Sequence, residues 1–359
     1  METAYLAALL TVQGIGQERV RALVRYFGSA RAGWLADSSA LSACGCLPAA
    51  VVDSLLEVRR RLAPADLLSG WRQQGIFVVA RRDAAYPAGL KTIYHPPELL
   101  FYRGSLPEHD RLLAIVGTRR ASAYGKNAAR QLAAALASAG FWVVSGAASG
   151  IDTAAHHGAL ETGRTIAVLG CGVDVSYPRQ NARLLEAIAA TGAVVSEYPP
   201  GTQPLPGLFP ARNRIISGLA RGVVIVEAAE KSGALITADA ALEQNRDVFA
   251  VPGSIFSPQS RGAHLLIKQG AKLVDCAADI LEEYQIEYCV NKALPQFSPA
   301  QTAVHNALSA ELPLSVEEIV MRTNLAVADV SYILLQFELQ GLVRAEGQRY
   351  VRSAWEGIY

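Results

Sequence analysis

Residues 112–125 read LLAIVGTRRASAYG. The apolar run over 112–116 has the length of a buried strand, and Gly117 lets the chain turn directly after it. A helix is expected to begin near Tyr124 or Gly125, after a turn that carries two arginines. This order of strand, turn and helix is the repeating unit of a parallel α/β sheet.

Similar apolar runs lie on both sides of this unit, and helix-compatible segments separate nearly all of them. They cover residues 76–80, 99–102, 141–144, 165–169, 193–196, 222–226, 247–250 and 272–274. Strands that are apolar along their whole length are typical of sheets with helices on both faces. We therefore predict an α/β fold with an extended Rossmann-like, doubly wound and mostly parallel sheet, occupying residues 73–288.

Residues 1–72 are expected to form a small domain of short helices. Its sequence Gly14-Ile-Gly16 predicts a turn between two apolar helices. Such a turn is similar to that of a helix-hairpin-helix or SAM-like module, whose amides can meet a phosphate of DNA. A plain helical hairpin has the same pattern, and the sequence does not decide between the two.

A compact helical tail is expected over residues 299–359, after a linker at 289–298 that contains Pro295. Ser315 and Glu318 match a capping box at the start of one helix. The other features of the tail are helices at 300–308 and 328–340, the latter ended by Gly341, and a two-stranded wing that turns at Gly347. This pattern is typical of a winged helix.

The totals place the chain among soluble globular proteins. Hydrophobic residues make up 51% of the 359, enough for a large core, and the formal net charge is +1. The five cysteines form no CxxC pair, so we predict neither a disulfide framework nor a metal site. The first ten residues lack the basic region with which a signal peptide begins, so we do not expect a signal peptide. No apolar run reaches the length that spans a bilayer. We expect a cytoplasmic protein without membrane insertion.

Glycine- or serine-rich turns follow four of the expected strands. They begin at Gly117, Ser145, Gly170 and Glu227. In a parallel sheet all four turns lie along the carboxyl edge, where open α/β folds bind their ligands. Small residues let backbone amides approach an anion closely, so four such turns suggest several phosphates. The usual GxGxxG and GxxxxGK[ST] signatures are absent from the sequence.

Basic residues gather around these turns, although the chain as a whole has nearly equal numbers of basic and acidic residues. Residues 111–151 and 198–226 contain no acid. The basic residues of the two stretches are Arg111, Arg119, Arg120, Lys126, Arg130, Arg212, Arg214 and Arg221. Tyr177 and Phe209 accompany them. Arginines that contact phosphates and rings that stack on bases are what a single strand requires, although core packing explains either ring alone equally well.

Few residues suggest catalysis. Asp152 and His156 are four residues apart and share a helical face, but a helix cap and a hydrogen bond to the backbone explain them better than an acid–base pair. Glu227 ends a strand, where it could act on a sugar or receive Arg212 or Arg214 in a buried pair. We predict a protein that is not an enzyme, with no catalytic residue, metal or cofactor.

Six segments resemble the DNA-processing protein A (DprA, also Smf) family. They are VGTRRASAYG (116–125), SGAASGIDTAAHHGAL (145–160), AVLGCGVDVSYPRQN (167–181), SEYPPGTQPLPGLFPARNRIISGL (196–219), EAAEKSGALITADAALEQNRDVFAVPG (227–253) and RGAHLLIKQGA (261–271). RNRIISGL together with GIDxxAH is highly specific as a set. The terminal domains are also similar to accessory domains of that family.

The resemblance implies a dimeric cytosolic protein that binds and protects incoming single-stranded DNA during natural transformation. It also implies a role in loading the RecA recombinase, with no established catalytic reaction. Combined with the turns and the basic stretches, it gives a set of expected DNA contacts. These are Gly117, Thr118, Arg119, Arg120, Ser145, Gly146, Tyr177, Arg179, Phe209, Arg212, Asn213, Arg214, Lys231, Ser232 and Gly233.

Self-association is expected at one edge of the sheet. Residues 272–274 form a late strand near that edge, and an open edge needs cover. The preceding helix, which includes His264 and Ile267, is apolar enough to form a symmetric patch with Leu273.

The expected winged helix has an acidic surface. Residues 299–340 carry five acids and one base, a sum of −4, and the third helix carries two acids and no base. A phosphate backbone would be repelled by this surface. We interpret the tail as a protein-contact or regulatory module.

Two other interpretations use the same residues. Rossmann-like proteins resembling the lysine-decarboxylase-like phosphoribohydrolases cleave nucleoside monophosphates with an Arg and a Glu near a PGGxGT turn. Pro252-Gly253 lacks the rest of that motif. A purely structural scaffold for the recombinase would not bind an oligonucleotide, and a gel shift separates it from a DNA-binding protein.

Overall fold

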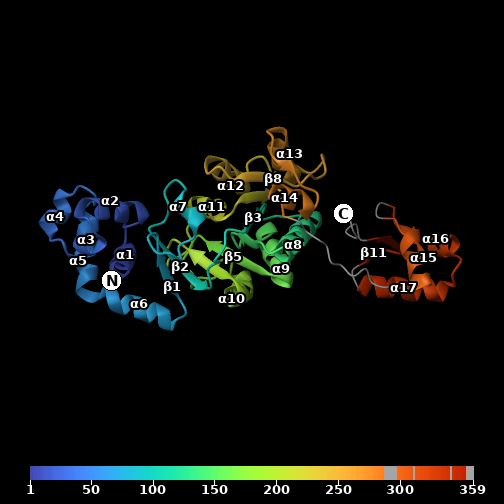
Figure 1. Ribbon diagram of the computed structural model, residues 1–359, viewed down its shortest axis with the longest axis horizontal. Coiled ribbons are helices and arrows are strands. Elements are labelled where there is room, and N and C mark those ends of the chain that lie inside the picture. The colour runs from blue at the N-terminus through green and yellow to red at the C-terminus, as the bar shows by residue number, and fades with distance from the viewer. Residues whose placement is uncertain (287–296, 310–311, 340–341, 353–359) are drawn as a thin grey trace. The chain divides into compact units, whose positions relative to one another are not determined.

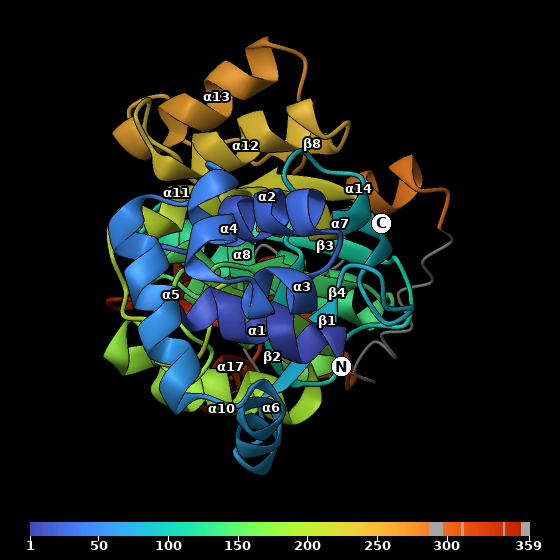
Figure 2. The ribbon, with the colours of Figure 1, turned by 90° about the vertical axis from the view of Figure 1, so that its left-hand side faces the viewer.

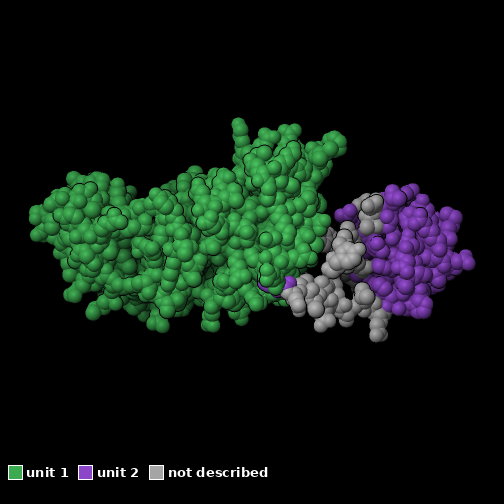
Figure 3. Space-filling view, turned by 45° about the horizontal axis from the view of Figure 1, so that its top comes forward, with its two compact units in different colours: residues 1–285 green, residues 286–359 purple. Residues whose placement is uncertain are grey.

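The computed structural model describes residues 1–286, 297–309, 312–339 and 342–352. The chain divides into two compact units, residues 1–285 and residues 286–359 (Figure 3). The expected linker falls almost wholly outside the described residues, and so does Gly341.

Six helices form the beginning of the first unit (Figure 2). They are α1 (Glu2–Thr11), α2 (Gln17–Phe27), α3 (Ala30–Leu35), α4 (Ser38–Ala43), α5 (Ala49–Arg61) and α6 (Pro64–Gln73). The chain turns between α1 and α2 at Gly14, where φ is +87° and a Cβ would lie 2.9 Å from a methyl carbon of Val51. Only glycine adopts this conformation without strain. A helical hairpin at Gly14-Ile-Gly16 is therefore present.

These helices share one hydrophobic core with the sheet that follows them. Leu9 of α1 belongs to the same buried cluster as Phe101 of the sheet. The buried Gln17 side chain donates hydrogen bonds to the backbone oxygens of Leu99 (3.1 Å) and Glu197 (2.9 Å). The helical module is thus fixed to the sheet by both apolar and polar contacts.

A nine-stranded sheet forms the centre of the unit (Figure 1). Its strands are β1 (Phe77–Ala80), β2 (Leu99–Gly104), β3 (Leu112–Val116), β4 (Trp142–Ser145), β5 (Arg164–Leu169), β6 (Ala193–Ser196), β7 (Gly222–Ile225), β8 (Asp247–Ala250) and β9 (Lys272–Leu273). Their spatial order is β1-β2-β6-β5-β4-β3-β7-β8-β9. The pairs β1–β2 and β2–β6 are antiparallel, and every pair from β6 to β9 is parallel. The predicted mostly parallel α/β sheet is confirmed.

Helices cover both faces of the sheet. They are α7 (Ala88–Lys91), α8 (Ala123–Ser138), α9 (Ile151–Thr162), α10 (Ala182–Thr191), α11 (Leu208–Leu219), α12 (Gly233–Glu243), α13 (Arg261–Lys268) and α14 (Ala277–Glu283). Leu112 and Ala114 of β3 face the layer formed by α7, α11, α12 and α13. Helices α8 and α9 pack against β3 and β4 from the other side. This arrangement is doubly wound.

The order of the strands reverses at β3. The chain moves outward from β3 through β4, β5 and β6, and then returns to place β7 on the other side of β3. Open α/β proteins bind ligands at the carboxyl ends of the strands at such a switch point.

The second unit has the elements of a winged helix. They are α15 (Pro299–Ala307), β10 (Leu314–Ser315), α16 (Val316–Thr323), α17 (Val327–Leu339), β11 (Val343–Glu346) and β12 (Arg349–Arg352). Both hydrogen bonds of the capping box between Ser315 and Glu318 are present, and the wing turns at Gly347 with φ +68°. The short strand β10 was not predicted, because two residues have no periodic pattern. It completes a three-stranded sheet in the order β10-β12-β11.

Candidate nucleic-acid interface

The four glycine- or serine-rich turns lie along one edge of the sheet, as predicted. Strands β7, β3, β4 and β5 are consecutive and parallel, so their carboxyl ends share that edge. The turns that begin at Gly117 and Glu227 follow β3 and β7, the strands on either side of the switch point. The site predicted from sequence therefore coincides with the place where this fold binds ligands.

The turn over residues 117–120 is held from two sides. The Thr118 N–H donates to the Glu227 backbone oxygen (2.7 Å), and the Ile151 N–H donates to the Thr118 oxygen (3.3 Å). Gly117 is needed because a Cβ would lie 2.8 Å from the Glu227 oxygen. The Arg119 side chain is exposed on this fixed backbone.

The Glu227 carboxylate fastens the start of α8. It accepts hydrogen bonds from the Ser122 backbone N–H (2.9 Å) and hydroxyl, and Ser122 is the N-cap of α8. Gly125 leaves room for it, since a Cβ there would lie 2.3 Å from a carboxylate oxygen. The prediction that Glu227 pairs with Arg212 or Arg214 is wrong, because α8 occupies this carboxylate.

Arg119, Phe209 and Tyr177 form a stack at the switch point. The guanidinium carbon of Arg119 lies 5.4 Å from the centroid of the Phe209 ring. The rings of Phe209 and Tyr177 have centroids 5.2 Å apart and planes tilted by 34°. Tyr177 is 39% exposed. Segments that are distant in the sequence thus bring two rings and a cation together, as a base and its phosphate would require.

A cavity of about 410 Å³ opens beside this stack. We call it the switch-point cavity. The expected contacts among its lining residues are Gly117, Arg119, Tyr177, Phe209, Arg212, Asn213, Ser232 and Gly233. The Asn213 side chain donates to the Gly233 oxygen (3.3 Å), which joins α11 to the start of α12. Arg120, Arg179 and Lys231 are exposed in the neighbouring turns.

Arg212 belongs to the floor of this cavity and is only 4% exposed. Its Nη1 donates to the backbone oxygens of Gly146 (2.9 Å) and Val168. Burial lowers the pKa of Arg212 to about 10, and the nearby Asp152 carboxylate opposes this shift. The guanidinium therefore stays charged at neutral pH. The hydrogen bonds from Nε and Nη1 go to the protein, while Arg212 still lines the cavity, so the expected DNA contact there stays a prediction.

Ser145 and Gly146 also lie below the surface. The Ser145 hydroxyl donates to the Ile115 oxygen (2.6 Å), and the Gly146 N–H donates to the Asp152 carboxylate (3.2 Å). A Cβ at Gly146 would lie 2.4 Å from the Arg212 guanidinium. Both residues are buried and bonded within the protein, and the expected DNA contacts there stay predictions. This glycine makes room for a buried arginine.

Arg214 lies in a different environment from Arg212. Its Nη2 donates to the buried Glu197 carboxylate (2.6 Å). Burial raises the pKa of Glu197, and the Arg214 charge opposes the rise. Arg214 lines a second cavity, between the α1–α2 turn and the segment after β6. The structure therefore does not bring Arg214 to the switch-point cavity, and the expected DNA contact at this residue stays a prediction.

Asp152 and His156 have structural partners. The Asp152 carboxylate accepts two backbone N–H groups, and burial raises its pKa. The Nδ1 atom of His156 lies 2.7 Å from the Thr165 hydroxyl, which itself donates to the Val143 oxygen (2.6 Å). Burial lowers the pKa of His156 to about 3, so the ring is neutral. The partner of His156 is a side chain and not the expected backbone group, and the two residues do not form an acid–base pair.

One group of described residues has the composition of a metal site. Ligand atoms of Asp275, Cys276 and Asp279 lie within 4.8 Å of one another. The Asp279 carboxylate accepts the backbone N–H groups of Asp275 (3.0 Å) and Cys276 (3.2 Å). These bonds cap α14, which is a sufficient reason for the cluster.

The residues expected at a dimer interface lie at the β9 end of the sheet. Strand β9 pairs only with β8 among the described strands, so it is an edge strand, and Leu273 is 45% exposed. Ile267 is partly buried, and the Nε2 atom of His264 lies 3.0 Å from the Gly253 oxygen. Self-association through this surface stays a prediction.

Sequence reasoning missed the polar residues that position the turns. Gln180 donates to the Ser149 hydroxyl (2.9 Å), and the buried Asn181 donates to the Ala147 oxygen (3.0 Å) and the Thr153 hydroxyl (2.8 Å). They tie the segment after Tyr177 to the turn after β4. Their place two and three residues after Tyr177-Pro178 is the signal that could have found them.

No helix within the described residues is both long and apolar enough to cross a membrane.

The fold and the site together define a Rossmann-like protein with an arginine and aromatic rings at the ligand-binding edge of its sheet. The family described as DNA recombination-mediator protein A matches residues 77–285, and the DprA winged helix domain matches residues 291–348. The chain belongs to this DNA recombination-mediator (DprA/Smf) family.

Its relatives include proteins of several bacteria. Protein Smf of Synechocystis is 36% identical over 98% of this chain and 99% of its own length. The DNA processing protein DprA of Bacillus subtilis is 47% identical over 60% of this chain and 74% of its own.

Two solved structures extend the comparison to the fold. The X-ray structure of DprA from Streptococcus pneumoniae has a TM-score of 0.67 at 40% identity, covering 80% of this chain and 99% of that one. A structure of DprA from Helicobacter pylori, described by its single-stranded DNA binding mode, has a TM-score of 0.54 at 30% identity, covering 60% and 97%.

Proposed function

We propose that this protein binds single-stranded DNA at the switch-point cavity and mediates recombination during natural transformation. The stack of Arg119, Phe209 and Tyr177 carries the proposal. A guanidinium next to partly exposed rings can hold a phosphate while a base stacks on the rings. The single-stranded DNA binding mode described for the H. pylori relative supports the same role here.

In the proposed complex the phosphates lie on exposed cations of the turns, Arg119, Arg120, Arg179 and Lys231. The start of α12 at Ser232-Gly233 adds the positive end of a helix dipole. Sequence preference is slight, because phosphate contacts carry little base information. The buried Arg212 supports the turns from below through its bonds to the Gly146 and Val168 oxygens.

The proposed role is that of a binding protein without turnover. The Asp152 and Glu227 carboxylates accept hydrogen bonds within the protein, and the His156 ring is fully buried with its Nδ1 atom beside the Thr165 hydroxyl. We propose that a cytoplasmic homodimer protects the strand and helps to load RecA. The exposed edge strand β9 supports the dimer.

Substitution of Arg119 tests the proposal. Arg119→Ala removes a charge-assisted contact worth about 1.5–3 kcal/mol, so the dissociation constant for an oligothymidine should rise roughly tenfold to a hundredfold. The melting temperature should stay unchanged, because the side chain is exposed. Arg60→Ala, which removes an exposed arginine of α5, is the matched control and should bind like wild type.

Two results would contradict the proposal. One is an Arg119→Ala variant that binds the oligothymidine as tightly as wild type. The other concerns catalysis: release of free base from nucleoside monophosphates by the wild-type protein, abolished in Glu227→Gln, would favour the phosphoribohydrolase-like enzyme.

A further inference from the structure

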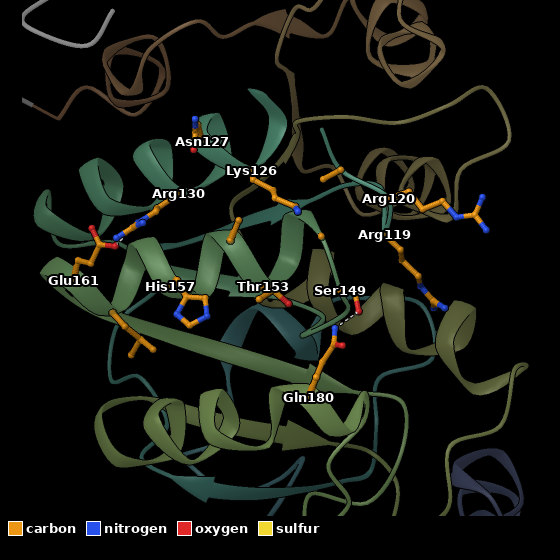
Figure 4. A pocket seen from close by; sticks show the side chains of 14 residues that line it. Arg119, Arg120, Lys126, Asn127, Arg130, Ser149, Thr153, His157, Glu161 and Gln180 are labelled. Carbon is orange, nitrogen blue, oxygen red and sulfur yellow. Dashed lines mark hydrogen bonds and ion pairs between the residues drawn. The ribbon is translucent and has the colours of Figure 1, made fainter. Parts of the chain in front are cut away.

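Another cavity, of about 890 Å³, also lies beside Arg119 and is built differently from the switch-point cavity. We call it the basic cleft. Its lining includes Arg119, Arg120, Lys126, Arg130, His157 and Gln180 (Figure 4). Neither Phe209 nor Tyr177 belongs to this lining. The basic cleft therefore offers cations without the two rings of the switch-point cavity.

The cleft lies where α8 and α9 approach each other closely. Gly158 of α9 lies against the backbone of α8, where a Cβ would come within 2.0 Å of the Arg130 oxygen. Lys126 and Arg130 are one turn apart on α8, about 6 Å along its axis. Figure 4 shows both side chains on the side of α8 that faces α9, which contributes Thr153 and His157. The cations thus form a row that leads away from Arg119.

The charge of this row is poorly compensated. None of the ion pairs within residues 1–286 involves Arg119, Arg120 or Lys126. Arg130 pairs with Glu161, but their side chains are 60% and 43% exposed. Exposed pairs of this kind contribute little to stability, so a phosphate can compete for Arg130. The row is suited to a polyanion.

The two cavities adjoin at a shared residue. Arg119 lines both of them. The hydrogen bond from Gln180 to Ser149 (2.9 Å) joins the segment after Tyr177 to the rim of the basic cleft (Figure 4). A chain of phosphates that leaves the rings therefore meets Arg119 first, and Lys126 and Arg130 next.

We propose that the basic cleft holds the backbone of the next segment of the same DNA strand, whose bases face away from the protein. The strand bends at Arg119 and continues between α8 and α9. This inference rests on the proposed function. It adds a second subsite that binds phosphates alone and that only a strand longer than the first subsite can reach.

Oligothymidines of two lengths, about four and about sixteen nucleotides, test the second subsite. The double variant Lys126→Ala/Arg130→Ala should bind the long one roughly tenfold more weakly than wild type does. For the long strand, the slope of log affinity against log salt concentration should be less steep than that of wild type by about 1.4, since each lost phosphate contact contributes about 0.7. Its affinity for the short one should be unchanged. Arg60→Ala/Lys91→Ala, two exposed cations outside both cavities, is the matched control.

The outcomes separate this inference from the function on which it rests. If wild type binds neither length, the proposed function fails. If wild type binds both, and the double variant binds the long strand like wild type or loses affinity equally for both lengths, only the second subsite is refuted. Equal affinity of wild type for both lengths also refutes it. Wild-type melting temperature of the double variant excludes unfolding as the cause of a loss.

Discussion

Removal of the buried guanidinium at Arg212 should destabilise the protein strongly. Arg212→Ala leaves the Asp152 carboxylate buried without its nearby positive charge, and leaves the Gly146 and Val168 oxygens without a donor. Breaking a buried charge pair costs about 3–5 kcal/mol. At about 1–2 °C per kcal/mol for a unit of this size, the melting temperature should fall by roughly 3–10 °C.

The loss should depend on pH, because Asp152 can be neutralised by a proton. Burial already raises the pKa of Asp152, and Arg212 opposes that rise. Without Arg212 the folded-state pKa rises further, whereas the unfolded value stays near about 3.9. The folded variant then binds the proton more tightly than the unfolded chain does, so its stability is greatest in acid and falls as the pH rises through the folded-state pKa.

Urea unfolding of wild type and Arg212→Ala between about pH 4 and neutrality measures this difference. The gap in the free energy of unfolding should be smallest at the acidic end and largest at neutral pH. Asp152→Asn in the Arg212→Ala background should recover part of the loss at neutral pH, because it removes the unpaired charge. A gap below about 1 kcal/mol at neutral pH, or one that widens in acid, would refute the structural role of Arg212.

Three other substitutions and one titration test separate parts of the account. Phe209→Ala should weaken oligothymidine binding by about 1–3 kcal/mol in a fluorescence anisotropy titration, with an unchanged salt slope, because it removes a stacking surface but no charge. For the wild-type protein, a plot of log affinity against log salt concentration should have a slope of about −3 to −4, as four to six phosphate contacts imply. An affinity that does not change with salt would contradict the proposed contacts between cations and phosphates. Glu227→Gln should lower the free energy of unfolding by about 1–3 kcal/mol by calorimetry, since Ser122 loses a charged acceptor. Ile267→Glu should give a folded monomer by light scattering; an unchanged dimer, or a wild-type protein that is itself monomeric, would count against the β9 interface.

The fold could be predicted because buried parallel strands have a strong sequence pattern. The apolar run at 112–116 and its equivalents match the strands within one or two residues at each end. The turns could be placed on one edge because parallel strands all end there. Strand β10 could not be found, because two residues that pair only with the distant β12 have no local pattern.

The types of residue at the site could be predicted from the sequence. Which of them are buried, and which partners they meet, could not. Arg212 and Arg214 lie two residues apart on α11, and the sequence predicts that they point in different directions. Which carboxylate each one meets depends on the order of the strands, because Glu197 after β6 and Glu227 after β7 look alike in sequence. Gly146 is also ambiguous, since an anion cradle and a space for a buried guanidinium both require a glycine.

In the proposed complex one DNA strand lies across the switch point, with one of its phosphates on Arg119. A crystal structure of the protein with a bound oligothymidine tests it most directly. We expect a base stacked against Phe209 or Tyr177 and the neighbouring phosphate within hydrogen-bonding distance of the Arg119 guanidinium. A strand bound to the α1–α2 hairpin or to the winged helix, with the switch-point cavity empty, would contradict it.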